Sequence, residues 1–427
     1  MHSRKDITMR RKLLGKVLVL TIAAMLVTSC SFNKGSTQTP FPNNESASPT
    51  GTTVPGSSTP TPTPTQTPEA TPEPTPEPTP VVKEPVKVKA AYVSGSVAGS
   101  SRFDQLIDLV NTTELNSIVL DIKESGTVNY ESQVPLVKEL GLVKKLYNVD
   151  EILKKCHDNN IHVIGRIVVF RDDGLATKST KFAIKKPSGA VWTEGKHGAW
   201  TNPYLQEVQD YNIEIAKEAV NLGFDEIQFD YVRFPTVKAS DVNYGENPPE
   251  KIQAISNFLK KATEEIKKVK DVPISADIFG IVAESDRDGK AIGQQFELLG
   301  QYIDYISPMI YPSHYANDSK GTMGNGVGQR INGVLFTKPD LDPYGVIYQS
   351  LLKIKDRISK APEYKAKVRP YIQDFTAKYL PTGYWQTYGK DQVRDQIKAI
   401  YDAGYEEWIL WNSGNNYTKD ALLPEGE

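Results

Sequence analysis

Residues 86–427 are predicted to form an α/β domain, a (β/α)8 barrel in which eight parallel strands close into a ring. Eight β-forming runs occur in this stretch, more than the roughly five or six strands of a typical open doubly wound sheet. Helical patterns separate the runs, and glycine follows some of them, which favours right-handed crossovers between parallel strands. Polar and aromatic residues follow one end of nearly every run, where a barrel carries its functional side chains.

The strands are expected at residues 86–94, 117–124, 162–170, 226–234, 274–280, 305–312, 368–375 and 407–412. In the fourth run, Ile227 and Phe229 alternate with Gln228 and Asp230, which is the two-residue period of a strand. Helices are expected at residues 104–111, 149–159, 203–222, 249–268, 289–303, 344–359 and 390–403. Residues 203–222 place apolar side chains near one face, and Gly223 ends that helix.

Residues 1–29 have the features of an export signal. Arg10, Arg11 and Lys12 precede an apolar run at 17–27 that is short for a membrane span. The run ends in the sequence VTSC, which resembles the lipobox of bacterial lipoproteins. The resemblance implies cleavage before Cys30, lipidation of this cysteine and attachment to the outer face of the cell membrane. A plain secretory signal or an uncleaved anchor is the alternative, and both also place the domain outside the cytoplasm.

Residues 30–85 are predicted to be a disordered linker, because they consist mainly of Ser, Thr, Pro and Gly with Thr-Pro and Glu-Pro repeats. Their prolines favour an extended polyproline conformation of about 3.1 Å per residue, which would hold the domain well over roughly 100 Å from the membrane. A proline-rich ligand for a recognition domain is the alternative interpretation.

Composition gives no indication of a cofactor or of nucleic acid. The formal net charge of the 427 residues is −2, so electrostatics provides no argument for nucleic-acid binding. The sequence contains no phosphate-binding loop, dinucleotide fingerprint or G-x-S-x-G motif. Its five histidines lack the close pairing that metal sites favour, so we expect neither a metal nor a cofactor. Cys156 is expected to be buried as a small apolar residue, and we expect a monomer.

Charged and aromatic residues follow the predicted strands, and we expect them to surround one cleft at the carboxyl end of the barrel. They are Asp121, Lys123 and Glu124 at the end of the second strand, Arg166 in the third, Asp230, Tyr231 and Arg233 at the end of the fourth, Asp277 in the fifth, Tyr311 at the end of the sixth, Asp374 at the end of the seventh, and Trp411 and Asn412 at the end of the eighth. An ordinary surface ion pair between Asp230 and Arg233 is the alternative interpretation of the fourth strand end.

Glycoside hydrolysis needs two carboxyl groups across the scissile bond. We expect Asp230 to act as nucleophile or base and Asp277 as its partner, because they lie at the ends of neighbouring strands. The rivals are Asp121, Glu124, Glu284 and Asp374. Arg166 and Arg233 are expected to orient the acids or tune their charge. Trp200 lies in an aromatic loop at 190–204 and is expected to stack on a sugar, while residues 313–344 are expected to form a lid or cleft wall.

From residue 86 to about residue 416 the chain resembles a glycosyl hydrolase family of bacterial extracellular barrel proteins. The resemblance is carried by the segments LDIKE, GRIVVFRD, WTNPY, FDEIQFDYVRFP, SADIFG, ISPMIYPSHY, RPYIQDF and WILWNSGN. It implies a barrel fold and a carbohydrate substrate.

A fainter similarity links the fourth strand to chitinase-type barrels, which carry D-x-x-D-x-D-x-E there. Val232 occupies the position of the proton donor, so the acid must come from another strand. We therefore predict a membrane-tethered glycoside hydrolase acting on an extracellular or cell-wall polysaccharide. The alternative is a barrel that binds polysaccharide without cleaving it.

Overall fold

The computed structural model describes residues 86–315, 317 and 324–426. The predicted signal peptide, the lipidation site Cys30 and the predicted linker lie outside the described residues, as do a few residues of the predicted lid. Within the described ranges, no helix is both long enough and apolar enough to cross a membrane.

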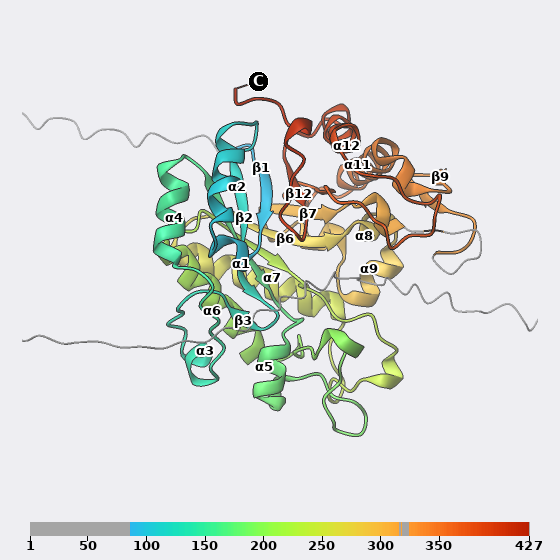
Figure 1. Ribbon diagram of the computed structural model, residues 1–427. Helices are drawn as coiled ribbons and strands as arrows, with labels where there is room; N and C mark the ends of the chain where they lie inside the picture. Colours follow the sequence, from blue (N-terminus) through green and yellow to red (C-terminus); the bar gives the residue numbers. More distant parts are fainter. Residues whose placement is uncertain (1–85, 316, 318–323, 427) are drawn as a thin grey trace, which may run out of the picture. The chain divides into compact units, whose positions relative to one another are not determined.

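Eight parallel strand positions form a closed barrel, which is the centre of the domain (Figure 1). In ring order the strands are β1 (Lys89–Val93), β2 (Ser117–Glu124), β4 (His162–Val168), β5 (Glu226–Asp230), β6 (Ile274–Phe279), β7 (Tyr305–Met309), β11 (Tyr371–Gln373) and β12 (Trp408–Trp411). β1 pairs with both β12 and β2, which closes the ring. The predicted (β/α)8 fold is confirmed.

The predicted strand at 368–375 consists of two pieces, β10 (Lys367–Val368) and β11, which both pair with β7. Pro370 lies between the pieces, and a proline has no N–H to donate to a strand ladder. This proline accounts for the interruption.

Helices surround the ring, with α2 and α4 on one side of the view and α11 and α12 on another (Figure 1). Six agree with the predicted ranges to within a few residues: α2 (Arg102–Asn111), α4 (Val149–Asp158), α6 (Gln206–Leu222), α7 (Lys251–Val269), α11 (Pro343–Ser359) and α12 (Lys390–Asp402). The predicted helix at 289–303 is instead divided into α9 (Asp286–Ile292) and α10 (Phe296–Leu299). Gly293 divides it, because its backbone is left-handed with φ +86° and a Cβ there would lie 2.9 Å from the Lys251 carbonyl oxygen.

Short elements that the sequence did not indicate lengthen the connections. They are α1 (Gly95–Ala98), β3 (Thr127–Val128), α3 (Pro135–Glu139), α5 (Asp173–Lys178), α8 (Gly280–Glu284), and the hairpin of β8 (Gln329–Ile331) and β9 (Val334–Phe336). The described residues also form 3-10 turns at η1 (Thr180–Phe182), η2 (Gly195–His197), η3 (Ala239–Asp241), η4 (Pro312–Tyr315), η5 (Pro339–Leu341) and η6 (Lys419–Ala421).

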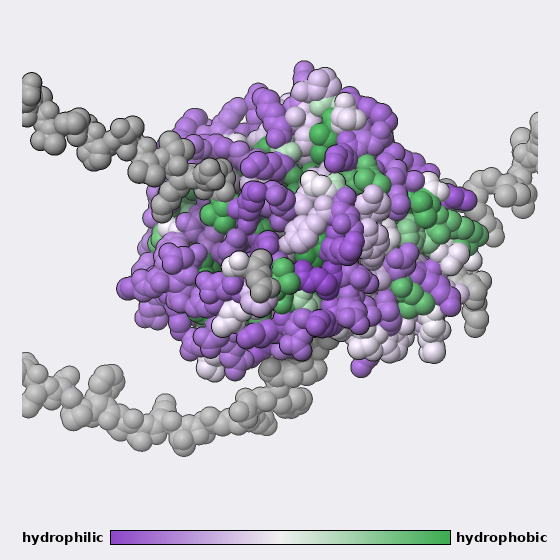
Figure 2. All heavy atoms as spheres, turned by 90° about the horizontal axis from the view of Figure 1, so that it is seen from above, coloured by the Kyte–Doolittle hydropathy of each residue, from purple (hydrophilic) through white to green (hydrophobic). Residues whose placement is uncertain are grey.

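The apolar core has two layers because strand side chains alternate between the two faces of the barrel wall. The outer layer packs the strands against the helices, and it includes Ile118, Leu120 and Cys156, whose predicted burial is confirmed. The inner layer contains Val119 and Ile164 among other apolar side chains. Figure 2 shows that hydrophilic residues cover most of the face in view, with apolar residues in small separate areas.

Polar side chains fill the barrel interior below its carboxyl end. Arg369 Nη1 and Nη2 donate to Glu226 Oε2 at 3.1 and 3.0 Å, and Tyr371 Oη donates to Gln228 Oε1 at 2.5 Å. β5 and the β10–β11 segment are not neighbours in the ring, so these bonds cross the interior. The barrel is therefore closed beneath its carboxyl end, and a ligand can approach only from that end.

Candidate active site

Arg166 of β4 lies at the centre of the charged layer at the carboxyl end of the barrel. Its Nη1 donates to Asp121 Oδ1 at 2.6 Å and to Glu124 Oε2 at 2.9 Å, both from β2. On the other side, its Nε and Nη2 donate to Asp230 Oδ2 of β5 at 3.1 and 2.5 Å. One buried guanidinium therefore holds three acidic side chains, because β2 and β5 are the two strands that flank β4.

Two aromatic rings lie against this guanidinium. Arg166 Cζ lies 5.6 Å from the ring centroid of Tyr92 and 5.7 Å from that of Trp411, and the two ring centroids are 4.2 Å apart. Tyr92 Oη also donates to Asp121 Oδ2 at 2.5 Å. Cation–π contacts of this kind fix the plane of the guanidinium and favour its charge. Sequence reasoning missed Tyr92, which comes from β1 and carries no motif.

Asp277 lies on β6, the strand next to β5, and differs from the acids held by Arg166. Its Oδ1 is buried and has no hydrogen-bond partner. Burial, and secondly the charge of Asp230, raise the pKa of Asp277 well above its usual range. The protonated form of Asp277 is therefore favoured relative to that of an ordinary aspartate, whereas Asp230 is paired with Arg166. Two carboxyl groups in such different environments are the arrangement that acid–base chemistry requires.

The rival acids are engaged in other contacts. Burial raises the pKa of Asp121 to about 6, with Arg166 acting against this and Glu124 adding to it. Asp121 Oδ1 accepts from Arg166 and Oδ2 from Tyr92 Oη, so Asp121 is held by Arg166 as Asp230 is, but on β2 and away from β6. Glu124 is more exposed, with 36% of its side chain accessible, and lies at the rim. Glu284 of α8 lines a different hollow of about 290 Å³ together with Arg357, so it lies apart from the acids around Arg166.

Lys123 does not face this site. Its Nζ lies 2.5 Å from Asp172 Oδ2 and 2.8 Å from Asn212 Oδ1, and its side chain is fully buried. The pairing of β2 with β4 shifts register between Asp121 and Lys123, which places Lys123 opposite Ile167 on the outer face of the barrel wall. A bulge reverses the side-chain alternation beyond it. The predicted substrate contact of Lys123 is therefore corrected to a structural ion pair.

Three other predicted binding residues have structural contacts. Asp374 accepts from Thr418 N at 2.8 Å and from Thr418 Oγ1 at 2.6 Å. Asn412 Nδ2 donates to the Asp374 carbonyl at 2.5 Å, so both residues hold the segment after β12. Trp200 is fully buried and its Nε1 donates to Glu194 Oε2 at 3.1 Å, so it offers no open face to a sugar.

Trp411 ends β12, and Tyr311 follows β7 by two residues. Trp411 is partly exposed, and its ring centroid is 6.5 Å from that of Tyr311. Burial, followed by the charges of Asp277 and Asp230, raises the pKa of Tyr311, so its phenol is a neutral donor.

Tyr231 and Arg233 lie beside Asp230 at the rim. Tyr231 has a left-handed backbone with φ +49°, and its amide donates to Asp230 Oδ1 at 2.6 Å. Left-handed backbone in a bulky residue stores strain and concentrates at functional sites. The alternative ion pair between Asp230 and Arg233 is absent from the described residues, where Asp230 pairs with Arg166 instead.

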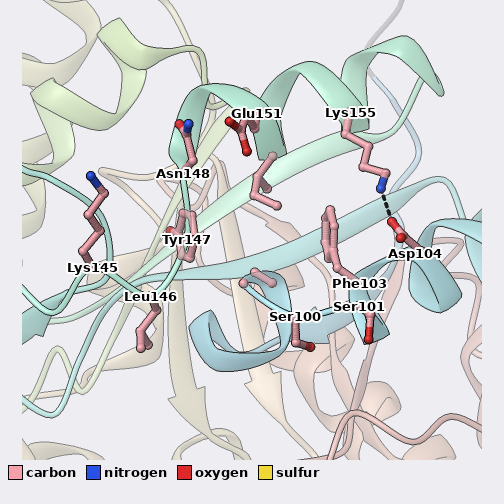
Figure 3. A pocket seen from close by; sticks show the side chains of 13 residues that line it. Ser100, Ser101, Phe103, Asp104, Lys145, Leu146, Tyr147, Asn148, Glu151 and Lys155 are labelled. Carbon is pink, nitrogen blue, oxygen red and sulfur yellow. Dashed lines mark hydrogen bonds and ion pairs between the residues drawn. The ribbon is translucent and has the colours of Figure 1, made fainter. Parts of the chain in front are cut away.

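A hollow of about 660 Å³ lies elsewhere on the domain, between α2 and α4 (Figure 3). Phe103 and Asp104 of α2 face Glu151 and Lys155 of α4 across it, and Lys155 pairs with Asp104 (Figure 3). None of the acids around Arg166 lines this hollow. Within the described residues, no group of three or more His, Cys, Asp or Glu side chains is arranged to hold a metal ion.

Known proteins agree with this architecture. A family model described as "Putative glycosyl hydrolase domain" matches residues 90–417. The chain belongs to this family. The match includes Asp121, Arg166, Asp230 and Asp277, so the candidate active site of this glycosyl hydrolase family member lies within the matched residues.

Solved structures include a hypothetical protein from Ruminiclostridium thermocellum, which is 45% identical, with 44% of this chain and 96% of that chain covered and a TM-score of 0.41. The glycoside hydrolase domain of PgaB (BpsB) from Bordetella bronchiseptica is 12% identical, with 79% of this chain and 99% of that chain covered and a TM-score of 0.54. The latter likeness supports the barrel fold. No curated protein matches the chain at a significant level.

Proposed function

We propose that the protein is a glycoside hydrolase that cleaves an extracellular or cell-wall polysaccharide. The observation that carries this proposal is the contrast between Asp277, buried with an unpaired oxygen, and Asp230, paired with Arg166 on the next strand. Glycosidase chemistry uses two carboxyl groups, one that donates a proton and one that attacks or acts as base, and these two environments suit the two roles. The family description and the glycoside hydrolase domain of PgaB support the same reaction class.

In the proposed reaction, Asp277 donates its proton to the glycosidic oxygen as the bond from that oxygen to the anomeric carbon breaks. Asp230 either attacks the anomeric carbon or removes a proton from the attacking water. Arg166 positions Asp230 through two hydrogen bonds, and Trp411 offers a partly exposed aromatic face beside it. The net change adds one water across the bond, and Asp277 recovers its proton by the end of the cycle.

The test is hydrolysis of a panel of polysaccharides, followed by the release of reducing ends. We expect the wild-type protein to cleave at least one polymer, and Asp230→Asn and Asp277→Asn each to lose at least about 100-fold in rate while circular dichroism shows that both variants are folded at the assay temperature. Asp271→Asn is the matched control, since its side chain is 88% exposed. A wild-type protein that binds a polymer without cleaving it would support the non-catalytic binding barrel instead. Unaltered cleavage by both active-site variants would refute the assignment of these acids.

We also propose that Cys30 carries a lipid that holds the domain on the extracellular side of the cell membrane. The lipobox-like sequence VTSC and the Thr- and Pro-rich residues that follow it support this localisation.

A further inference from the structure

Two arginines flank the ring of Tyr231, the residue directly after the proposed nucleophile or base. Arg171 Cζ lies 4.8 Å from the Tyr231 ring centroid and Arg233 Cζ lies 5.2 Å from it. Arg171 Nη1 also donates to Tyr231 Oη at 2.5 Å. Tyr231 directly follows Asp230 in the chain, and the charge of Asp230 acts on the pKa of Arg233, so this guanidinium lies near the acids.

Neither arginine has an acidic partner within the described residues. Other buried arginines of the domain are paired: Arg166 with Asp230, and Arg369 with Glu226. Arg233 is 7% exposed, and its single hydrogen bond runs from Nη1 to the Phe234 carbonyl at 2.9 Å. Its Nε and Nη2 have no hydrogen-bond partner within the described residues, so both are available to a ligand.

The surroundings of Arg233 are aromatic. Its Cζ lies 4.9 Å from the ring centroid of Trp200 and 4.5 Å from that of Phe279. Rings on the faces of a guanidinium fix its plane and leave its donor edge free, which suits bidentate recognition of a carboxylate or phosphate. The buried ring of Trp200 therefore packs against Arg233, a contact that the sequence did not indicate.

Arg233 is also a buried cation, and burial is the main influence on its pKa. Burial lowers the pKa of Arg233 and the charge of Arg171 lowers it further, while Tyr231, Glu194 and Asp230 act in the opposite direction. Glu194 is bonded to Trp200 Nε1 and Asp230 to Arg166, so neither pairs with Arg233. A neutral ligand would leave this cationic pair uncompensated.

We propose that Arg171 and Arg233 bind an anionic substituent, a carboxylate or a phosphate, on the sugar next to the scissile bond. The substrate is then an acidic polysaccharide. This inference rests on the proposed function for its location beside the cleaved bond, but the anion site itself can be tested by binding alone.

The test is calorimetric binding to the full chain carrying Asp277→Asn, which slows turnover. The probes are a uronic-acid oligosaccharide and its carboxyl-reduced neutral counterpart, together with a phosphate-substituted oligosaccharide and its dephosphorylated counterpart. We expect one acidic member to bind roughly 10- to 100-fold more tightly than its neutral partner, because charge-assisted hydrogen bonds are strong. Whichever pair shows the preference identifies the source of the anion.

Adding Arg233→Gln or Arg171→Gln should remove most of this preference, whereas Arg233→Lys should retain part of it, since lysine keeps the charge without the planar fork. Arg287→Gln is the matched control, with a side chain that is 82% exposed. Should Arg233→Gln fail to fold, the partly exposed Arg171 gives the second variant. Equal binding of the acidic and neutral members of both pairs, or a preference that survives both glutamine variants, would overturn the inference.

Failure of this inference differs from failure of the proposed function. Cleavage of neutral polymers without an acidic preference would refute the anion site and leave the hydrolase intact. Acidic oligosaccharides that bind through Arg233 but are never cleaved would refute the hydrolase and leave the anion site intact.

Discussion

Arg166→Met is the substitution that most directly probes the charged layer. Methionine fills much of the same space but leaves Asp121 and Asp230 buried without their cation, since Arg166 and Asp121 have side-chain exposures of only 3% and 2%. Removing one partner of a buried ion pair costs about 3–5 kcal/mol. We expect a loss of this size in the free energy of unfolding at pH 7.5, measured by urea denaturation.

The loss should depend on pH in a defined direction. The pKa of Asp121 is raised from 3.8 to about 6 by burial, so this group favours the folded state fully below pH 3.8 and loses that contribution as the pH rises through about 6. Arg166 acts to lower the pKa of Asp121, so removing Arg166 raises this pKa further and increases the stability that is lost when Asp121 ionises. The gap between wild type and variant should therefore narrow from pH 7.5 to pH 5. A gap below about 1 kcal/mol, or one that widens on acidification, would refute this account of the layer. The exposed Arg287→Met should show no measurable gap.

Three further predictions follow from the same contacts. Asp277→Asn should slow hydrolysis by about 100- to 10,000-fold for sugar leaving groups but much less for activated aryl leaving groups. Kinetics on both substrate types will test this difference. An equal loss of rate for both types would exclude Asp277 as the acid. Lys123→Met should lower the free energy of unfolding, measured in urea, by about 3–5 kcal/mol, since it breaks a fully buried ion pair with Asp172. The KM for the cleaved polymer should stay unchanged. A raised KM would show that Lys123 contacts the substrate. Cys30→Ala should move the expressed protein from the membrane fraction to the medium or the soluble extracellular fraction, and retention in the membrane would argue for an uncleaved anchor.

The strands and most helices could be predicted because alternation and helical periodicity are local properties of the sequence. The position of the candidate site could be predicted for the same reason, because Asp230 and Asp277 each lie near the end of a recognisable strand. Parallel strands bring such ends together at one edge of the barrel. Which acid has the raised pKa could not be predicted, since that depends on Arg166 reaching Asp230 and leaving Asp277 Oδ1 unpaired.

The incorrect predictions for Lys123 and Trp200 also have specific physical causes. The register shift after Asp121 moves Lys123 to the outer face, and no residue type in this stretch announces a bulge. The aromatic loop indicated a sugar platform, but Trp200 packs inward under Arg233 because Glu194 satisfies its indole nitrogen.

The bonds from Arg369 to Glu226 and from Tyr371 to Gln228 have a consequence for how a polymer can be handled. These bonds fill the interior at the base of the barrel, so no polysaccharide can pass through it. For the proposed polysaccharide substrate, entry and product release therefore take place at the same end of the barrel.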